Sequence, residues 1–201
     1  MKGEKTFFSA RNVTFLAVLV ALVVVLQVLG GYFKIGATSL SFVLVPIVLG
    51  GLLVGVWAGG LLGLLFGLIT LVYGITGADA FTGYLFAAHP VLTSVICLGK
   101  GLFAGLAAGG IYKLVSAKNR LAAVFVASAT APIVNTGLFI LGAFCMMGTI
   151  SELADGQSVV YFLFIVCAGV NFLIEVAINL ICAPALYTVE NLLEKRVHAR
   201  G

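Results

Sequence analysis

The sequence predicts an all-α integral membrane protein with six transmembrane helices, and three observations lead to this fold class. Of the 201 residues, 62% are hydrophobic and only 9% are charged, with a mean hydropathy of +1.24. Soluble domains are about 45–50% apolar and about 25% charged. The apolar residues fall into six runs, most of them close to the roughly 20 residues that a helix needs to cross a bilayer. We therefore expect one polytopic domain over residues 1–201.

The six predicted spans cover residues 13–33, 40–55, 57–75, 91–115, 121–146 and 159–188. The second is the shortest, and a turn near residues 55–60 separates it from the third, so a re-entrant pair is an alternative there. Glycine recurs at every fourth position in this region, at Gly51, Gly55, Gly59, Gly63 and Gly67. This spacing favours close helix packing over a direct role in binding.

Lysine and arginine residues predict that both termini are cytoplasmic. Of the eleven basic residues, Lys100 lies inside the fourth span and Lys34 falls outside the cell, which leaves nine on the cytoplasmic side. These nine are Lys2, Lys5, Arg11, Lys113, Lys118, Arg120, Lys195, Arg196 and Arg200. Cytoplasmic segments of membrane proteins carry an excess of lysine and arginine. The remaining external connections contain Asp79, Glu152 and Asp155.

The sequence lacks the motifs that are typical of several classes of function. The four cysteines lie in apolar runs without CxxC spacing or a histidine at ligand distance, so we expect neither a metal site nor a cofactor. Residues around Lys100 do not complete a phosphate-binding loop, and neither HExxH nor GxSxG occurs. The net charge of +4 is scattered over the chain ends, which excludes a nucleic-acid partner. We expect no catalytic residues, and a lipid bilayer as the surroundings.

Polar residues inside the last three spans predict a binding pocket. Asn171, Glu175 and Asn179 are four apart and share one helix face. At 1.5 Å per residue, Lys100 lies roughly 14 Å and Asn135 and Asn171 roughly 17 Å below the outer surface. An ionisable group at this depth costs at least about 2.5 kcal/mol unless it faces a partner or a cavity. The alternative is a buried Lys100–Glu175 ion pair with amides that join helices.

The connection over residues 76–90 is the longest and contains several aromatic residues. They form either an interfacial belt or a lid over the pocket. Tyr84 and His89 are the candidate substrate-binding residues of this loop, and His89 has no visible catalytic or metal partner.

Three further features carry a resemblance that covers nearly the whole chain. They are its size with six spans, the segment Ala17-Val-Leu-Val-Ala21, and the stretch Leu40-Ser-Phe-Val-Leu-Val-Pro46 followed by glycine-rich residues 50–60. On these features the chain resembles the substrate-binding S components of energy-coupling factor (ECF) vitamin transporters, close to the riboflavin and pantothenate branches. Such proteins lie in the plasma membrane of prokaryotes.

The resemblance implies a transport mechanism. S components bind a vitamin from outside, beneath the loop after the third span, with residues of the last three spans. They dock through small residues of the first span, here Ala17 and Ala21, onto a transmembrane coupling subunit driven by two cytoplasmic ATPases. Toppling in the membrane then releases the vitamin inside.

By position, the pocket would contain Lys100, Asn135, Asn171 and Glu175. Lys100 favours pantothenate as the substrate because a lysine suits a carboxylate. Riboflavin or another micronutrient is an alternative, and so is an autonomous secondary carrier that uses Glu175.

Overall fold

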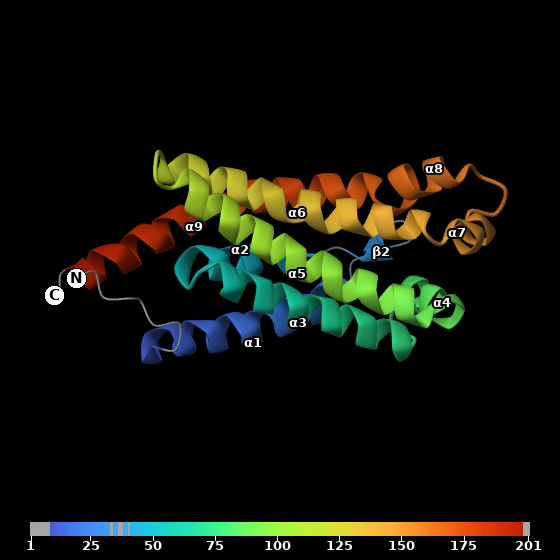
Figure 1. Ribbon diagram of the computed structural model, residues 1–201, viewed down its shortest axis with the longest axis horizontal. Helices are drawn as coiled ribbons and strands as arrows, with labels where there is room; N and C mark the ends of the chain where they lie inside the picture. The colour runs from blue at the N-terminus through green and yellow to red at the C-terminus, as the bar shows by residue number, and fades with distance from the viewer. Residues whose placement is uncertain (1–8, 33, 36–37, 40, 199–201) are drawn as a thin grey trace.

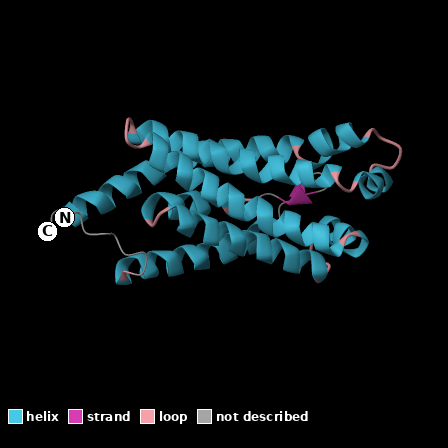
Figure 2. Cartoon of the chain, viewed as in Figure 1, coloured by secondary structure: helices cyan, strands magenta, loops and turns pink. Residues whose placement is uncertain are grey.

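Apolar runs with few charges form helices over most of the described chain, which comprises residues 9–32, 34–35, 38–39 and 41–198 of the computed structural model. Helix is the dominant structure, as Figure 2 shows. The main helices are α1 (Ala10–Tyr32), α2 (Leu44–Leu53), α3 (Val56–Ile75), α5 (Pro90–Val115), α6 (Arg120–Phe144) and α9 (Gly169–His198). Shorter elements are α4 (Ala80–Ala88), α7 (Met147–Leu153), α8 (Val159–Tyr161) and the π-helical η1 (Phe162–Cys167). The predicted all-α class is confirmed, and two antiparallel two-residue strands, β1 (Lys34–Ile35) and β2 (Thr38–Ser39), are its small exception.

Within the described residues, five helical segments are long and apolar enough to cross a membrane: Ala10–Gly31, Val56–Ile75, Pro90–Val115, Arg120–Phe144 and Val159–Leu193. The remaining predicted span contains only the ten-residue α2. Ten residues rise about 15 Å, roughly half the hydrocarbon thickness. A membrane protein of about six helices is therefore confirmed, with one helix that reaches only part of the way. Residues 33 and 40, which the prediction placed in the first two spans, lie outside the described residues.

The short length of α2 follows from the residues at its two ends. Pro46 lies in the first turn of the helix, where a missing N–H costs no intrahelical hydrogen bond. A helix that began at residue 40 would place this proline in its interior. At the other end, Gly55 adopts a φ of 129°, which residues with a Cβ rarely adopt, and the chain turns there into α3.

Apart from Glu190, the described basic and acidic residues near the helix ends belong to opposite ends of the bundle. The start of α1, the turn from α5 into α6 and the end of α9 lie at one end (Figure 1), and Arg11, Lys113, Lys118 and Arg120 belong to the first two of these segments. The opposite end carries α4 and α7 with the acidic residues of the external connections (Figure 1): Asp79, Glu152 and Asp155. This is the separation that cytoplasmic termini predict. Outside the described residues lie Lys2, Lys5 and Arg200, and the side chains of Lys34, Lys195 and Arg196 are not described either.

Glycines allow α3 and α5 to approach until their backbones touch. A Cβ at Gly63 would overlap the carbonyl group of Gly101, and a Cβ at Gly59 would lie 2.8 Å from the carbonyl oxygen of Gly105. The packing interpretation of the glycine repeat is confirmed at these positions.

The last predicted span is helical but not uniform. The backbone N–H of Ala168 donates to the carbonyl of Leu163 at 3.0 Å, a bond over five residues that closes the π-helical turn η1. Such turns insert an extra residue into a helix and often occur at functional sites. Beyond it, Asn171, Glu175 and Asn179 are 6%, 5% and 0% exposed. Their predicted position on one helix face is confirmed, and that face is turned into the bundle.

Two apolar clusters fill the two halves of the bundle. The inner cluster is built around α2, whose Leu44 and Ile47 are fully buried. The outer cluster joins α4, α7 and η1 through Leu85, Ile150 and Leu163. Because α2 occupies only the inner half, the outer half of its path is left for other groups.

Candidate substrate-binding site

A cavity with a volume of about 100 Å³ borders on members of both apolar clusters. On the same scale, a cavity for one water molecule needs roughly 10–15 Å³. The cavity is therefore large enough for a small organic molecule. Its walls come from α1, α3, α4, α5, α6, η1 and α9, and from Ser41 just ahead of α2.

Four of the predicted substrate-binding residues line this cavity: Lys100 from α5, Asn135 from α6, and Asn171 and Glu175 from α9. Helix packing brings these residues together from three different helices. Asn179, one turn deeper, is absent from the lining, and its Nδ2 donates to the backbone carbonyl of Glu175 at 2.8 Å.

The ammonium group of Lys100 lies over two aromatic rings. Its Nζ lies 5.5 Å from the ring centroid of Phe66 and 5.8 Å from that of Phe139, within the range of cation–π attraction. Among the described residues, no carboxylate lies within 4.0 Å of this ammonium group. The side chain is therefore positioned in the cavity while its charge remains available to an anion.

Glu175 has a different partner from the one that the ion-pair alternative assigns to it. Its Oε1 accepts a hydrogen bond from the backbone N–H of Ser41 at 3.1 Å. Ser41 lies just ahead of α2, whose amino-terminal end carries partial positive charge. The carboxylate thus ties α9 to the non-helical chain that replaces the outer half of the second span. Non-helical backbone at membrane depth is tolerated where it lines a cavity.

Asn135 is the clearest sign of an incomplete polar site. The side chain is 5% exposed, and its Oδ1 is buried with no hydrogen-bond partner among the described residues. A buried acceptor without a donor costs about 1–3 kcal/mol. Since Asn135 lines the cavity, a ligand donor there would remove this cost.

The outer end of the cavity is also polar. Thr82 donates its hydroxyl to Oδ2 of Asp79 at 2.6 Å, and the backbone N–H of Asp79 donates to the carbonyl of Tyr73 at 3.0 Å. These three residues all line the cavity. Between the two polar ends, Phe81 and Phe139 meet with ring centroids 5.9 Å apart.

Tyr84 and His89 lie outside the cavity lining, in contrast to their predicted contact with substrate. The Tyr84 hydroxyl donates to Oε2 of Glu152 at 2.7 Å, and this hydrogen bond raises the pKa of Tyr84. His89 Nε2 lies 3.1 Å from Oγ1 of Thr149. Both contacts connect the segment over residues 76–90, which contains the helix α4, to α7. Tyr84 and His89 therefore contribute to the packing of α4 against α7 at the outer end of the bundle.

Several lining residues were not singled out from the sequence as site residues. Phe66 and Phe139 look like ordinary apolar residues of a membrane helix, and nothing in their spacing marks the lysine between them. Ser41 falls within the second span that the sequence predicts. The sequence marks Asp79 only as an external acidic residue, although a lid over a pocket must contribute some polar groups to it.

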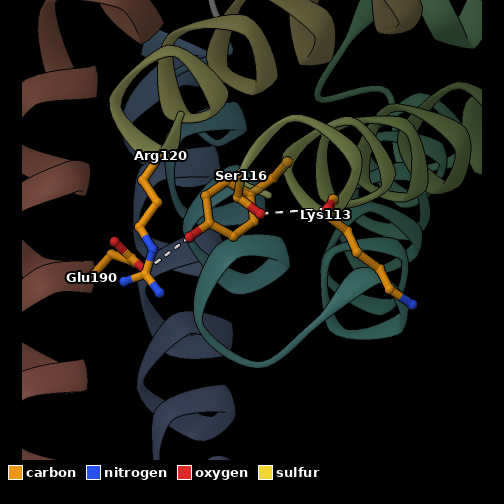
Figure 3. A network of polar contacts seen from close by, with 5 residues as sticks. Lys113, Ser116, Arg120 and Glu190 are labelled. Carbon is orange, nitrogen blue, oxygen red and sulfur yellow. Dashed lines mark hydrogen bonds and ion pairs between the residues drawn. The ribbon is translucent and has the colours of Figure 1, made fainter. Parts of the chain in front are cut away.

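At the inner end of the bundle, a polar network joins α5, α6 and α9 (Figure 3). Tyr112 donates to Oε1 of Glu190 at 2.8 Å, and Arg120 lies 3.8 Å from the same oxygen. The Ser116 hydroxyl donates to the carbonyl of Lys113 at 3.4 Å in the turn beside it.

The predicted docking residues Ala17 and Ala21 are exposed on α1. Val24 and Val28 continue the same side of this helix and are 41% and 43% exposed. The described part of the chain contains no group of three or more His, Cys, Asp or Glu side chains that could bind a metal ion.

Comparison with known proteins identifies a family whose model covers most of the chain. The model of a family described as ECF transporter, substrate-specific component, matches residues 11–187. No curated protein matches the chain significantly.

Proposed function

We propose that this chain, which belongs to the family of substrate-specific components of ECF transporters, binds a small water-soluble vitamin at the outer side of the membrane for ATP-driven import. Membership makes it a multi-pass membrane subunit of a transporter, and it supports the proposal that the chain has no enzymatic activity of its own. Pantothenate is the substrate that we propose, and the plasma membrane of a prokaryote is the location.

The observation that carries the substrate proposal is the Lys100 ammonium, which belongs to the cavity lining and has no described carboxylate within 4.0 Å. Pantothenate has a carboxylate for this cation, and its amide and two hydroxyls suit the other polar groups of the cavity lining. Riboflavin, the alternative, has no carboxylate and needs aromatic faces for stacking. The faces of Phe66 and Phe139 are instead turned toward Lys100.

The partners that we propose are a transmembrane coupling subunit and two cytoplasmic ATPases. Ala17 and Ala21 form the docking side of α1, because small exposed residues allow another helix to approach closely. This side points away from the buried residues Leu19 and Val23, which hold α1 to the bundle.

The test is copurification of the chain with the coupling subunit and both ATPases, followed by uptake of labelled pantothenate into proteoliposomes. Ala17→Trp and Ala21→Trp should abolish both assembly and uptake. Leu22→Trp is the matched control. Leu22 is also exposed, at 40%, but it follows Ala21 by one residue and therefore lies about 100° further around the helix. Assembly that survives both alanine variants contradicts the docking side, and uptake by the chain alone contradicts the dependence on partners.

A further inference from the structure

The cavity has two polar ends at different depths. At the inner end, Phe66 of α3 contacts Lys100. Seven residues later on the same helix, the carbonyl of Tyr73 accepts the hydrogen bond from Asp79. Seven residues of α-helix rise about 10 Å. Lys100 and Asp79 are therefore separated by about that distance along the cavity.

The two ends differ in charge and in hydrogen-bonding capacity. Lys100 has only donors to offer, and no described carboxylate lies within 4.0 Å of it. Asp79 is a carboxylate that accepts hydrogen bonds, and one of its oxygens is already fixed by Thr82. The inner end thus attracts a carboxylate, whereas the outer end repels one and attracts hydroxyl or amine groups.

Glu175 does not reverse this polarity. Its carboxylate is bound to the N–H of Ser41 at the amino end of α2, and it accepts hydrogen bonds as Asp79 does. In the same cavity lining, the unsatisfied Oδ1 of Asn135 also requires a donor. The inner end therefore fits a carboxylate followed closely by a donor such as an amide N–H.

The middle of the cavity is apolar. Phe81 and Phe139 meet there, and Ile96 of α5 lines the same space. A ligand that reaches from Lys100 to Asp79 must place alkyl groups between its polar ends. Charged groups in the middle would be desolvated without partners.

We propose that the cavity binds an elongated organic anion with its carboxylate innermost, and that Asp79 selects for hydroxyl or amine donors about 10 Å away at the other end of the ligand. The proposal rests on the function proposed above and adds an orientation and a specificity-determining residue to it. Pantothenate meets the requirement, because its eight bonds from carboxylate carbon to terminal hydroxyl extend roughly 10 Å.

The first test identifies the small molecule that the detergent-purified protein retains, by mass spectrometry of the released compound. We expect a carboxylate with hydroxyl or amine groups at its far end. A retained neutral or cationic compound would overturn this inference. It would leave the transporter function intact, because assembly with the coupling subunit is measured separately.

The second test compares equilibrium binding of labelled pantothenate with that of its analogue in which both hydroxyls are replaced by hydrogen. Asp79→Asn should weaken pantothenate binding at least tenfold and leave the affinity for the analogue unchanged, which also demonstrates an intact fold. Asp155→Asn is the control, because Asp155 is an exposed acid at the same end of the bundle and outside the cavity lining. Equal losses for both compounds, or no loss for either, would overturn the role of Asp79.

Discussion

Helix α5 presents two contrasting sides to the rest of the molecule. Toward α3, Gly101 and Gly105 have no side chains and the two backbones are in contact. Toward the cavity, Thr93, Cys97 and Lys100 of the same helix line an open space. The α3–α5 pair is therefore a closely packed support, and both of its helices also contribute side chains to the lining of the cavity.

The packed side should be the most sensitive to substitution. Gly63→Ala places a methyl group against the Gly101 carbonyl and should destabilise the protein by about 3 kcal/mol, because neither backbone can move away easily. Gly99→Ala is the matched control, since nothing lies within 4 Å of a Cβ there. The control should be unchanged or up to about 1 kcal/mol more stable through helix propensity. Thermal unfolding in detergent measures both variants, and equal midpoints would contradict the comparison.

The cavity side should respond in binding and not in stability. Lys100→Met keeps an unbranched apolar side chain of nearly the same length, but it removes the ammonium group and its cation–π attraction to Phe66 and Phe139. We expect a loss of about 2 kcal/mol in pantothenate affinity, roughly 30-fold, with an unchanged unfolding midpoint. Lys113→Met, an exposed lysine at the inner end, is the control. Affinity that is equal in the two variants would remove Lys100 from the site.

Substitution of Glu175 should affect both stability and binding. Glu175→Gln retains an oxygen acceptor for the Ser41 N–H but loses the stronger charge-assisted bond, which should reduce stability by about 1 kcal/mol. Pantothenate affinity should change less than in Lys100→Met, because this carboxylate is hydrogen-bonded to Ser41 and lies more than 4.0 Å from the Lys100 ammonium. Equilibrium binding and thermal unfolding of one preparation give both values. A loss of binding as large as that of Lys100→Met would indicate that Glu175 and Lys100 act as a unit.

The same contrast explains what the sequence could predict. The glycine repeat and the stripe from Asn171 to Asn179 depend on the helical period, which is local and visible in the sequence. The Ser41–Glu175 contact joins residues 134 positions apart and depends on the late start of α2 at Leu44. Helix depth placed Lys100 and Glu175 near one another, but depth alone could not decide whether they pair. That depends on the positions of neighbouring rings and on the path of the connection after α1.

The smallest effect is expected at the inner end, far from the cavity. Tyr112→Phe removes one hydrogen bond to the largely buried Glu190 and should cost about 1 kcal/mol of stability. Arg120→Gln should cost less, because Arg120 is 46% exposed and lies 3.8 Å from the carboxylate, and exposed ion pairs are worth about 0–1 kcal/mol. Neither variant should change pantothenate affinity. Since α5, α6 and α9 meet in this network and also form the cavity walls, a change in affinity would show that the inner end controls the site.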